Sequence, residues 1–72
     1  MNVQEALKKC IEEKGIKQRH IAERLGINEN TFSQMITGKR KIEADEFIDI
    51  CLCIDVDVGE LVNKMLNKKD GN

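Results

Sequence analysis

The sequence predicts an all-α domain in which five short helices surround one small core. Along most of the 72-residue chain, apolar residues recur every three or four positions, which is the spacing of a single buried helical face. Alternation with a period of two, which is typical of a half-buried strand, is almost absent. Glycine or capping residues interrupt the apolar segments often enough that each helix must be short.

The first two expected helices are each closed by a glycine. The helix from residue 3 to Gly15 carries its apolar residues on one face: Val3, Ala6, Leu7, Cys10 and Ile11. Gly15 can end this helix as its C-terminal cap. A shorter helix then turns Ile21, Ala22 and Leu25 inward and ends at Gly26.

The third helix is expected between Asn28 and Gly38. The Asn28 side chain can act as its N-cap by accepting a hydrogen bond from a first-turn N–H group. Phe32, Met35 and Ile36 lie on one face, which predicts that this face is buried.

Acidic residues mark the start of the fourth helix. Glu43, Asp45 and Glu46 lie where the positive end of the helix dipole favours carboxylates, although Glu43 is a poor N-cap. The apolar side of this helix consists of Phe47, Ile48, Ile50, Cys51 and Ile54.

A capping-box spacing opens the fifth helix. Asp57 and Glu60 are three residues apart, with Asp in the usual place of Ser or Thr. The apolar residues that follow are Leu61, Val62, Met65 and Leu66. We therefore expect one domain over residues 1–66 and a flexible C-terminal tail over residues 67–72.

Composition argues against a secreted or membrane protein. No apolar run approaches the ~20 residues of a membrane helix, and the N-terminus lacks the apolar segment of a secretory signal. The three cysteines are an odd set, whereas a secreted disulfide framework usually has an even number. Reduced thiols in the cytoplasm are therefore expected.

The small net charge hides a basic centre. Residues 14 to 41 hold seven cations against two acids, a net charge of +5, whereas the remaining residues hold five lysines against eleven acids, a net charge of −6. A polyanion close to the basic segment would be attracted to it even though the net charge of the chain is −1.

The residues around Gly26 have the spacing of a helix-turn-helix. Ala22 is small enough for a second helix to approach closely, and Gly26 supplies a positive φ for a tight turn. We expect the Ile27 side chain to anchor this turn in the core. An ordinary helical hairpin also places glycine in its turn, so the spacing alone leaves both interpretations open.

The outer face of the third helix favours the DNA-binding interpretation. At about 100° per residue, Asn30, Gln34 and Thr37 lie opposite the apolar face, with Glu29 and Ser33 on one shoulder and Thr31 on the other. Asn and Gln can bond adenine twice at the major-groove edge, and Ser or Thr bond bases more loosely. Lysine and arginine before and after this unit suit phosphates on both sides of a groove.

The segment KQRHIAERLGINENTFSQMITGKR, residues 17–40, resembles the helix-turn-helix of the phage Cro/C1-repressor family, often called XRE-type. The resemblance extends to VDVGEL at residues 56–61 and implies a compact five-helix, lambda-repressor-like fold. It also implies a transcriptional regulator that binds operator DNA as a homodimer.

Combined with the resemblance, the pattern assigns two sets of DNA-contacting residues. The base-reading set is Glu29, Asn30, Ser33, Gln34 and Thr37. The phosphate-binding set is Lys17, Gln18, Arg19, Asn28, Thr31, Lys39, Arg40 and Lys41. Glu29 has two interpretations: it can accept a hydrogen bond from cytosine N4, or it simply favours the helix N-terminus electrostatically.

No catalytic, cofactor or metal site is expected. Cys51 and Cys53 lie about 200° apart on a helix and cannot easily bind one metal together. They are either core or bystander thiols, or part of a redox or metal sensor. His20 has no Ser, Cys or acid placed to form a catalytic set with it.

The sequence thus predicts a double-stranded DNA-binding transcriptional regulator, a repressor, that is not an enzyme. Two alternatives remain open. One is an antitoxin or anti-repressor of the same fold that also binds a partner protein. The other is a protein-interaction module that does not bind DNA, which the acidic total and Glu29 would accommodate.

Overall fold

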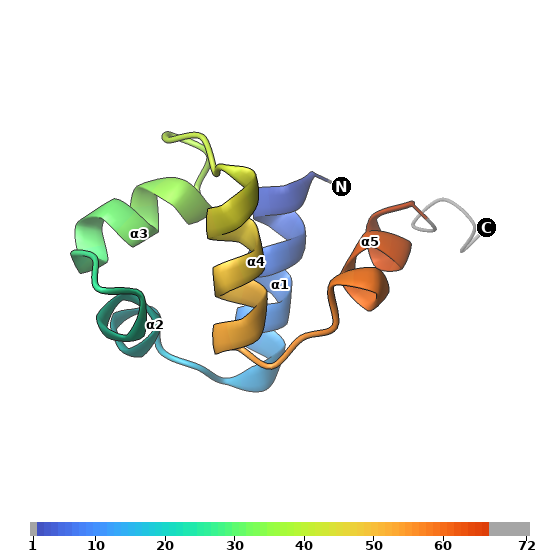
Figure 1. The fold of residues 1–72 in the computed structure, drawn as a ribbon, viewed down its shortest axis with the longest axis horizontal. Helices are drawn as coiled ribbons and strands as arrows, with labels where there is room; N and C mark the ends of the chain where they lie inside the picture. The colour runs from blue at the N-terminus through green and yellow to red at the C-terminus, as the bar shows by residue number, and fades with distance from the viewer. Residues whose placement is uncertain (1, 67–72) are drawn as a thin grey trace.

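The structure, a computed structural model, describes residues 2–66 and contains five helices within them (Figure 1). They are α1 (Val3–Lys14), α2 (Gln18–Leu25), α3 (Glu29–Ile36), α4 (Ala44–Cys53) and α5 (Val58–Leu66). No strand occurs in this part of the chain, so the predicted all-α class with five helices is confirmed. The expected tail, residues 67–72, lies outside the described residues.

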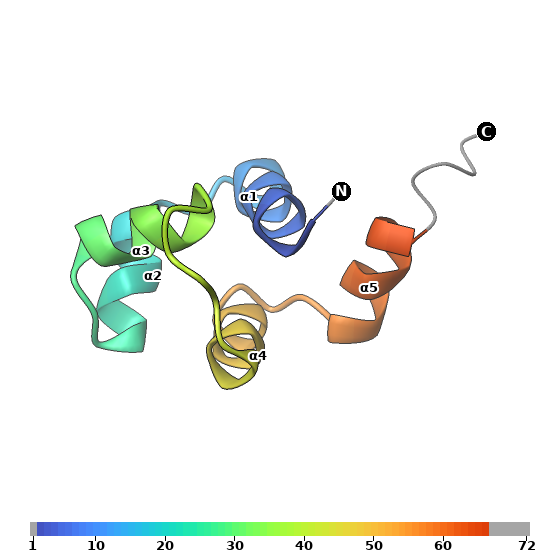
Figure 2. The ribbon, with the colours of Figure 1, turned by 90° about the horizontal axis from the view of Figure 1, so that it is seen from above.

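Helices α1 and α4 lie in the middle of the molecule (Figures 1 and 2). Helix α2 packs against α3 and α4, while α1 packs against α3 and α5. Figures 1 and 2 show α2 and α3 together at one end of the molecule and α5 at the opposite end. The packing of α5 therefore depends mainly on α1.

One buried cluster joins all five helices, and it holds most of the residues predicted to face inward. Its members are Ala6, Leu7, Cys10, Ile11, Ile21, Ala22, Phe32, Met35, Ile36, Ile50, Cys51, Ile54 and Leu61. Partly buried side chains such as Leu25, Ile27, Phe47 and Met65 pack around it. Burial of this apolar surface is the main force that holds such short helices in place.

Three predicted core residues are instead exposed. Ile48 is 48% exposed, Val62 is 39% exposed and Leu66 is 65% exposed. Ile48 lies about 200° around α4 from Ile50, which points into the core. Val62 and Leu66 are exposed because α5 packs mainly on α1 and buries only the stripe that contains Leu61.

The helix boundaries follow the predicted capping residues closely. Gly15, Gly26 and Gly38 follow the ends of α1, α2 and α3. The Asp57 carboxylate accepts hydrogen bonds from the Gly59 and Glu60 N–H groups at 2.7 and 3.3 Å, and so caps the start of α5.

Candidate nucleic-acid interface

The turn between α2 and α3 has the geometry that the sequence predicts. Gly26 adopts a φ of +74°, and its N–H donates to the Glu23 carbonyl oxygen at 3.2 Å. The next N–H, of Ile27, donates to the Ala22 carbonyl at 3.0 Å, which completes a Schellman cap. Ala22 is 1% exposed. This turn fixes the direction in which α3 leaves α2.

Asn28 caps the N-terminus of α3. Its Oδ1 accepts hydrogen bonds from the Asn30 N–H at 2.8 Å and the Thr31 N–H at 3.2 Å. The expected N-cap is therefore confirmed. Because the cap uses only the carbonyl oxygen, the Asn28 side-chain NH₂ can still donate to a phosphate oxygen.

The outer face of α3 is a polar ridge presented to solvent. Phe32, Met35 and Ile36 are buried. The ridge consists of the exposed residues Glu29, Asn30, Gln34 and Thr37, with Thr31 and Ser33 half-buried at its sides. The predicted division of this helix into an inner apolar face and an outer polar face is confirmed.

Thr37 is partly committed to the protein. Its hydroxyl donates to the Ser33 carbonyl oxygen at 2.9 Å, so toward a base it retains its acceptor capacity and its methyl group. The Asn30 and Gln34 side chains make no hydrogen bond within residues 2–66, so their amide groups keep both donor and acceptor capacity.

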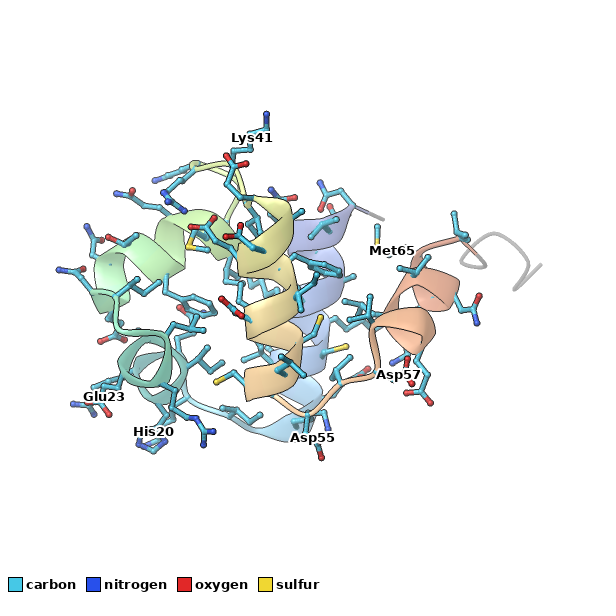
Figure 3. The ribbon with its side chains drawn as sticks, in the orientation of Figure 1. His20, Glu23, Lys41, Asp55, Asp57 and Met65 are labelled. Atoms are coloured by element: carbon cyan, nitrogen blue, oxygen red, sulfur yellow. The ribbon has the colours of Figure 1, made fainter. Side chains whose placement is uncertain are left out.

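The loop after α3 is fixed by backbone and side-chain bonds. The Lys39 and Arg40 N–H groups donate to the Gln34 carbonyl oxygen at 2.9 and 3.1 Å. They are therefore not available for phosphate. The Lys39 and Lys41 side chains are exposed, and Lys41 extends away from the body of the domain (Figure 3).

Arg40 differs from its two neighbours because it is paired with Glu46 of α4. Its Nη1 lies 3.3 Å from Glu46 Oε1, and its Nη2 lies 3.1 Å from Oε2. This hydrogen bond from Arg40, together with the Glu43 N–H bond to the same carboxylate, lowers the pKa of Glu46 below its ordinary value of 4.5. No helical spacing connects positions 40 and 46, so sequence reasoning missed this pair. The one available signal was the Glu43–Glu46 spacing, which resembles a capping box.

The start of α2 offers uncapped N–H groups beside two cations. Lys17 occupies the N-cap position but makes no side-chain capping bond. The Lys17 and Arg19 side chains are exposed, and Gln18 is half-buried. Uncapped first-turn N–H groups and the positive end of the helix dipole favour an anion at this position.

Comparison with known families identifies the fold. A family model for a Cro/C1-type HTH DNA-binding domain matches residues 6–65, which is most of the chain. The chain belongs to this Cro/C1-type family. Comparison with curated proteins and with solved structures gives no significant match. The family assignment confirms the resemblance drawn from residues 17–40.

The cysteines of this Cro/C1-type domain differ in exposure. Cys10 and Cys51 are buried, whereas Cys53 is half-buried. Burial raises the pKa of the Cys51 thiol above its ordinary value, and the nearby Cys10 adds a smaller contribution. Within residues 2–66, no group of three or more His, Cys, Asp or Glu side chains is placed to hold a metal. His20 lies exposed on the outer side of α2 (Figure 3).

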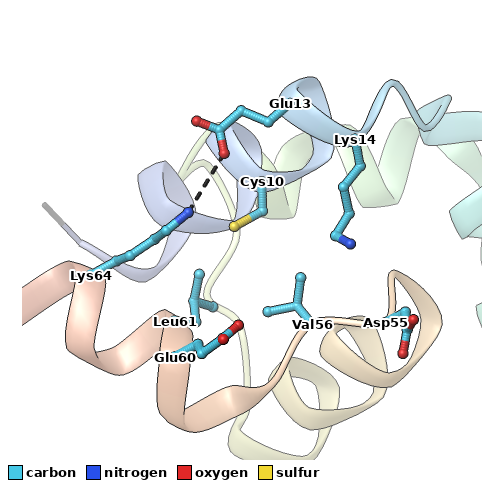
Figure 4. Close-up of a pocket in the computed structure, with 8 residues that line it drawn as sticks. All are labelled: Cys10, Glu13, Lys14, Asp55, Val56, Glu60, Leu61 and Lys64. Carbon is cyan, nitrogen blue, oxygen red and sulfur yellow. Dashed lines mark ion pairs between the residues drawn. The ribbon is translucent and has the colours of Figure 1, made fainter.

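A small recess separates α1 from α5 in the Cro/C1-type domain (Figure 4). Its volume is about 120 Å³, and Cys10, Val56 and Leu61 form its apolar lining. The Glu13 and Lys64 side chains pair across one edge at 3.6 Å. Typical small-molecule pockets have volumes of about 300–1,000 Å³, so this recess is too small for such a ligand. None of the helices in the described residues is long and apolar enough to span a membrane.

Proposed function

We propose that this domain is a sequence-specific transcriptional regulator whose α3 enters the major groove of duplex DNA. The observation that carries this proposal is the exposed polar ridge on α3, which is bordered by cations at both ends of the helix-turn-helix. Asn30 and Gln34 offer paired donors and acceptors that match an adenine edge. Glu29, Ser33 and Thr37 complete the base-reading set.

Phosphate contacts on both sides of the groove hold α3 in register. On one side they come from Lys17, Gln18 and Arg19 at the uncapped start of α2. On the other side Lys39 and Lys41 are exposed, whereas Arg40, which the sequence assigns to the same set, is paired with Glu46. Asn28 and Thr31 lie at the start of α3 and suit a phosphate beside the groove. Such contacts position the protein but carry no sequence information.

We further propose that the domain acts as a repressor in the cytoplasm and that it is not an enzyme. Repression requires only that an occupied operator be closed to other proteins, which a bound helix-turn-helix domain achieves by itself. Membership of a DNA-binding family supports this role.

A homodimer on DNA is the third part of the proposal. Val62 and Leu66 are exposed on α5, at the end of the molecule opposite α2 and α3 (Figure 1). An apolar stripe in this position suits contact with a second copy of the chain. Two α3 helices would then reach half-sites ~34 Å apart, as in other helix-turn-helix repressors.

Titration of random duplex DNA at several salt concentrations tests whether the domain binds DNA at all. A DNA-binding domain should lose affinity linearly on a log–log plot against salt, because each phosphate contact releases counterions. Absence of binding at every salt concentration would contradict the proposal. It would favour an interaction module that has lost DNA binding.

Selection of bound sequences from a random pool then supplies a cognate site. On this site the base-reading and phosphate-binding residues can be tested separately. Gln34→Ala should cost ~1–3 kcal/mol on the cognate site and little on random DNA. Lys39→Ala should weaken binding to both duplexes equally and should reduce the salt slope by about 1. Equal effects of the two substitutions on both duplexes would refute this division of roles.

A specific observation also favours a protein partner. Leu52 is 72% exposed and Ile48 is 48% exposed on the outer side of α4, close to the acids Asp45 and Asp49. An antitoxin or anti-repressor of this fold would use such a surface while α3 binds DNA. Leu52→Asp should then abolish complex formation with a co-purified partner without changing the affinity for DNA.

A further inference from the structure

We propose that Glu46 competes with DNA phosphate for the Arg40 guanidinium. Because Glu46 binds this cation, the phosphate backbone cannot, and the affinity of the domain for duplex DNA is lowered. The inference rests on the proposed function and adds to it a residue that tunes affinity from outside the helix-turn-helix. Glu46 is a positioning residue, because it acts through Arg40.

The geometry commits most of the Arg40 donors to the protein. Arg40 Nη1 lies 3.3 Å from Glu46 Oε1 and 3.5 Å from the Lys41 carbonyl oxygen. Arg40 Nη2 lies 3.1 Å from Glu46 Oε2. Three of the five guanidinium N–H groups are therefore directed at protein acceptors. A phosphate that grips the end of the guanidinium must displace the carboxylate.

The charges reinforce this competition. Arg40 and Glu46 together carry no net charge, so a phosphate meets no net attraction from the pair. The pair is also only partly screened by water, since the exposed fractions of the two side chains are 41% and 31%. Lys39 and Lys41, on either side of Arg40, are exposed. The loop therefore offers two cations to DNA and withholds the third.

Glu46→Gln removes the charge with little disturbance of α4. Glu46 Oε1 also accepts a hydrogen bond from the Glu43 N–H at 2.9 Å, and the glutamine carbonyl can accept the same bond. Asp49→Asn is the matched control, because it makes the same charge change one turn further along α4 on an exposed side chain. Arg40→Ala alone and combined with each substitution completes the set.

In the experiment, the whole chain is titrated into random duplex DNA over a range of low salt concentrations. Fluorescence anisotropy of the DNA measures binding. At the lowest salt, Glu46→Gln should bind about fivefold more tightly. Its log–log salt slope should become steeper by about 0.9, since one more phosphate is neutralised. In the Arg40→Ala background this gain should disappear, and Arg40→Ala alone should change affinity by roughly twofold or less. Asp49→Asn should give a smaller gain that persists without Arg40.

Two outcomes would overturn the inference. If Glu46→Gln weakens binding, Glu46 presents Arg40 to the phosphate rather than withholding it. If Glu46→Gln and Asp49→Asn give equal gains that survive Arg40→Ala, only the total charge matters. Both results presuppose that the unmodified chain binds DNA with a salt-dependent affinity. Failure of that first measurement would instead refute the proposed function.

Discussion

Asp55 occupies a backbone conformation that residues other than glycine usually avoid. Its φ is +59°, and it follows the end of α4 at the position that glycine holds after α2. The Val56 N–H donates to the Cys51 carbonyl oxygen at 2.9 Å, so the same Schellman cap closes this helix. A left-handed L residue costs roughly 1–2 kcal/mol. A substitution that removes this strain should therefore raise the free energy of unfolding.

We expect Asp55→Gly to raise the free energy of unfolding by about 0.5 kcal/mol. Relief of the left-handed strain exceeds the extra entropy that glycine brings to the unfolded chain, about 0.4–1 kcal/mol. Urea unfolding followed by circular dichroism measures the difference. Asp55→Ala is the control, because it removes the same charge, keeps a Cβ and lacks the tolerance of Asn for the left-handed region. An equal gain in both variants would show that charge rather than backbone strain is responsible.

The Arg40–Glu46 pair gives the stability of the fold a dependence on acid pH. Hydrogen bonding from Arg40 keeps the folded-state pKa of Glu46 below its ordinary 4.5. A carboxylate with a depressed folded-state pKa stabilises the fold above its unfolded-state pKa and loses that contribution as the pH falls through the folded-state value. The thermal midpoint of the unmodified chain should therefore exceed that of Glu46→Gln at pH 7. The two midpoints should converge as the pH drops below 4.5. A difference that stays constant over this range would contradict the pairing.

At the scale of helices, the sequence predicts boundaries better than it predicts exposure. Asn28, Gly26 and Asp57 fix helix ends through hydrogen bonds to neighbouring backbone groups, and such local chemistry can be read from the chain. Hydrophobicity alone predicts that Ile48 and Leu66 face the core. Their exposure depends on which neighbouring helix covers each face. This tertiary packing cannot be read from the few residues around each position.

In the candidate interface, too, the sequence predicts the local features but not the tertiary contacts. Helical periodicity correctly placed Asn30 and Gln34 opposite the buried Phe32. It gives no indication that the Arg40 side chain is paired with Glu46, whereas the side chains of Lys39 and Lys41 form no ion pair within residues 2–66. An ion pair between a loop and the next helix depends on tertiary packing, which a charge pattern in the sequence does not specify.

Helix α5 is the element whose attachment is most easily weakened. It packs mainly on α1, through the fully buried Leu61 and the Glu13–Lys64 ion pair at the surface. Exposed ion pairs contribute little, so apolar contacts hold α5 in place. Leu61 is the fully buried residue among them, and Val58 and Met65 are partly buried beside the core. Leu61→Ala should cost about 2–5 kcal/mol. Amide hydrogen exchange should then accelerate more in α5 than in α2 and α3. Uniform acceleration throughout the domain would show that α5 does not open separately.

Across the whole molecule, charge is separated along the chain. Residues 43–60 contain seven acids and no lysine or arginine, whereas residues 14–41 carry a net charge of +5. The first segment forms α4 and the start of α5, and the second includes α2 and α3. A charge separation of this kind orients the domain as it approaches a polyanion, with the α2–α3 end leading.

Self-association through α5 predicts a specific loss of cooperativity. Replacing Val62 and Leu66 by Gln together should leave binding to a single cognate half-site unchanged, because both residues are exposed and lie outside the helix-turn-helix. On a duplex with two half-sites ~34 Å apart, the apparent affinity should fall by at least about tenfold, since the second domain is no longer held nearby. Electrophoretic mobility shifts resolve one from two bound copies. Leu52→Gln on α4 is the matched control, because Leu52 is 72% exposed and lies outside the proposed contact. If it reduces cooperativity as strongly, the dimer contact lies on α4 instead, and the outer face of α4 would then not be available to a different partner.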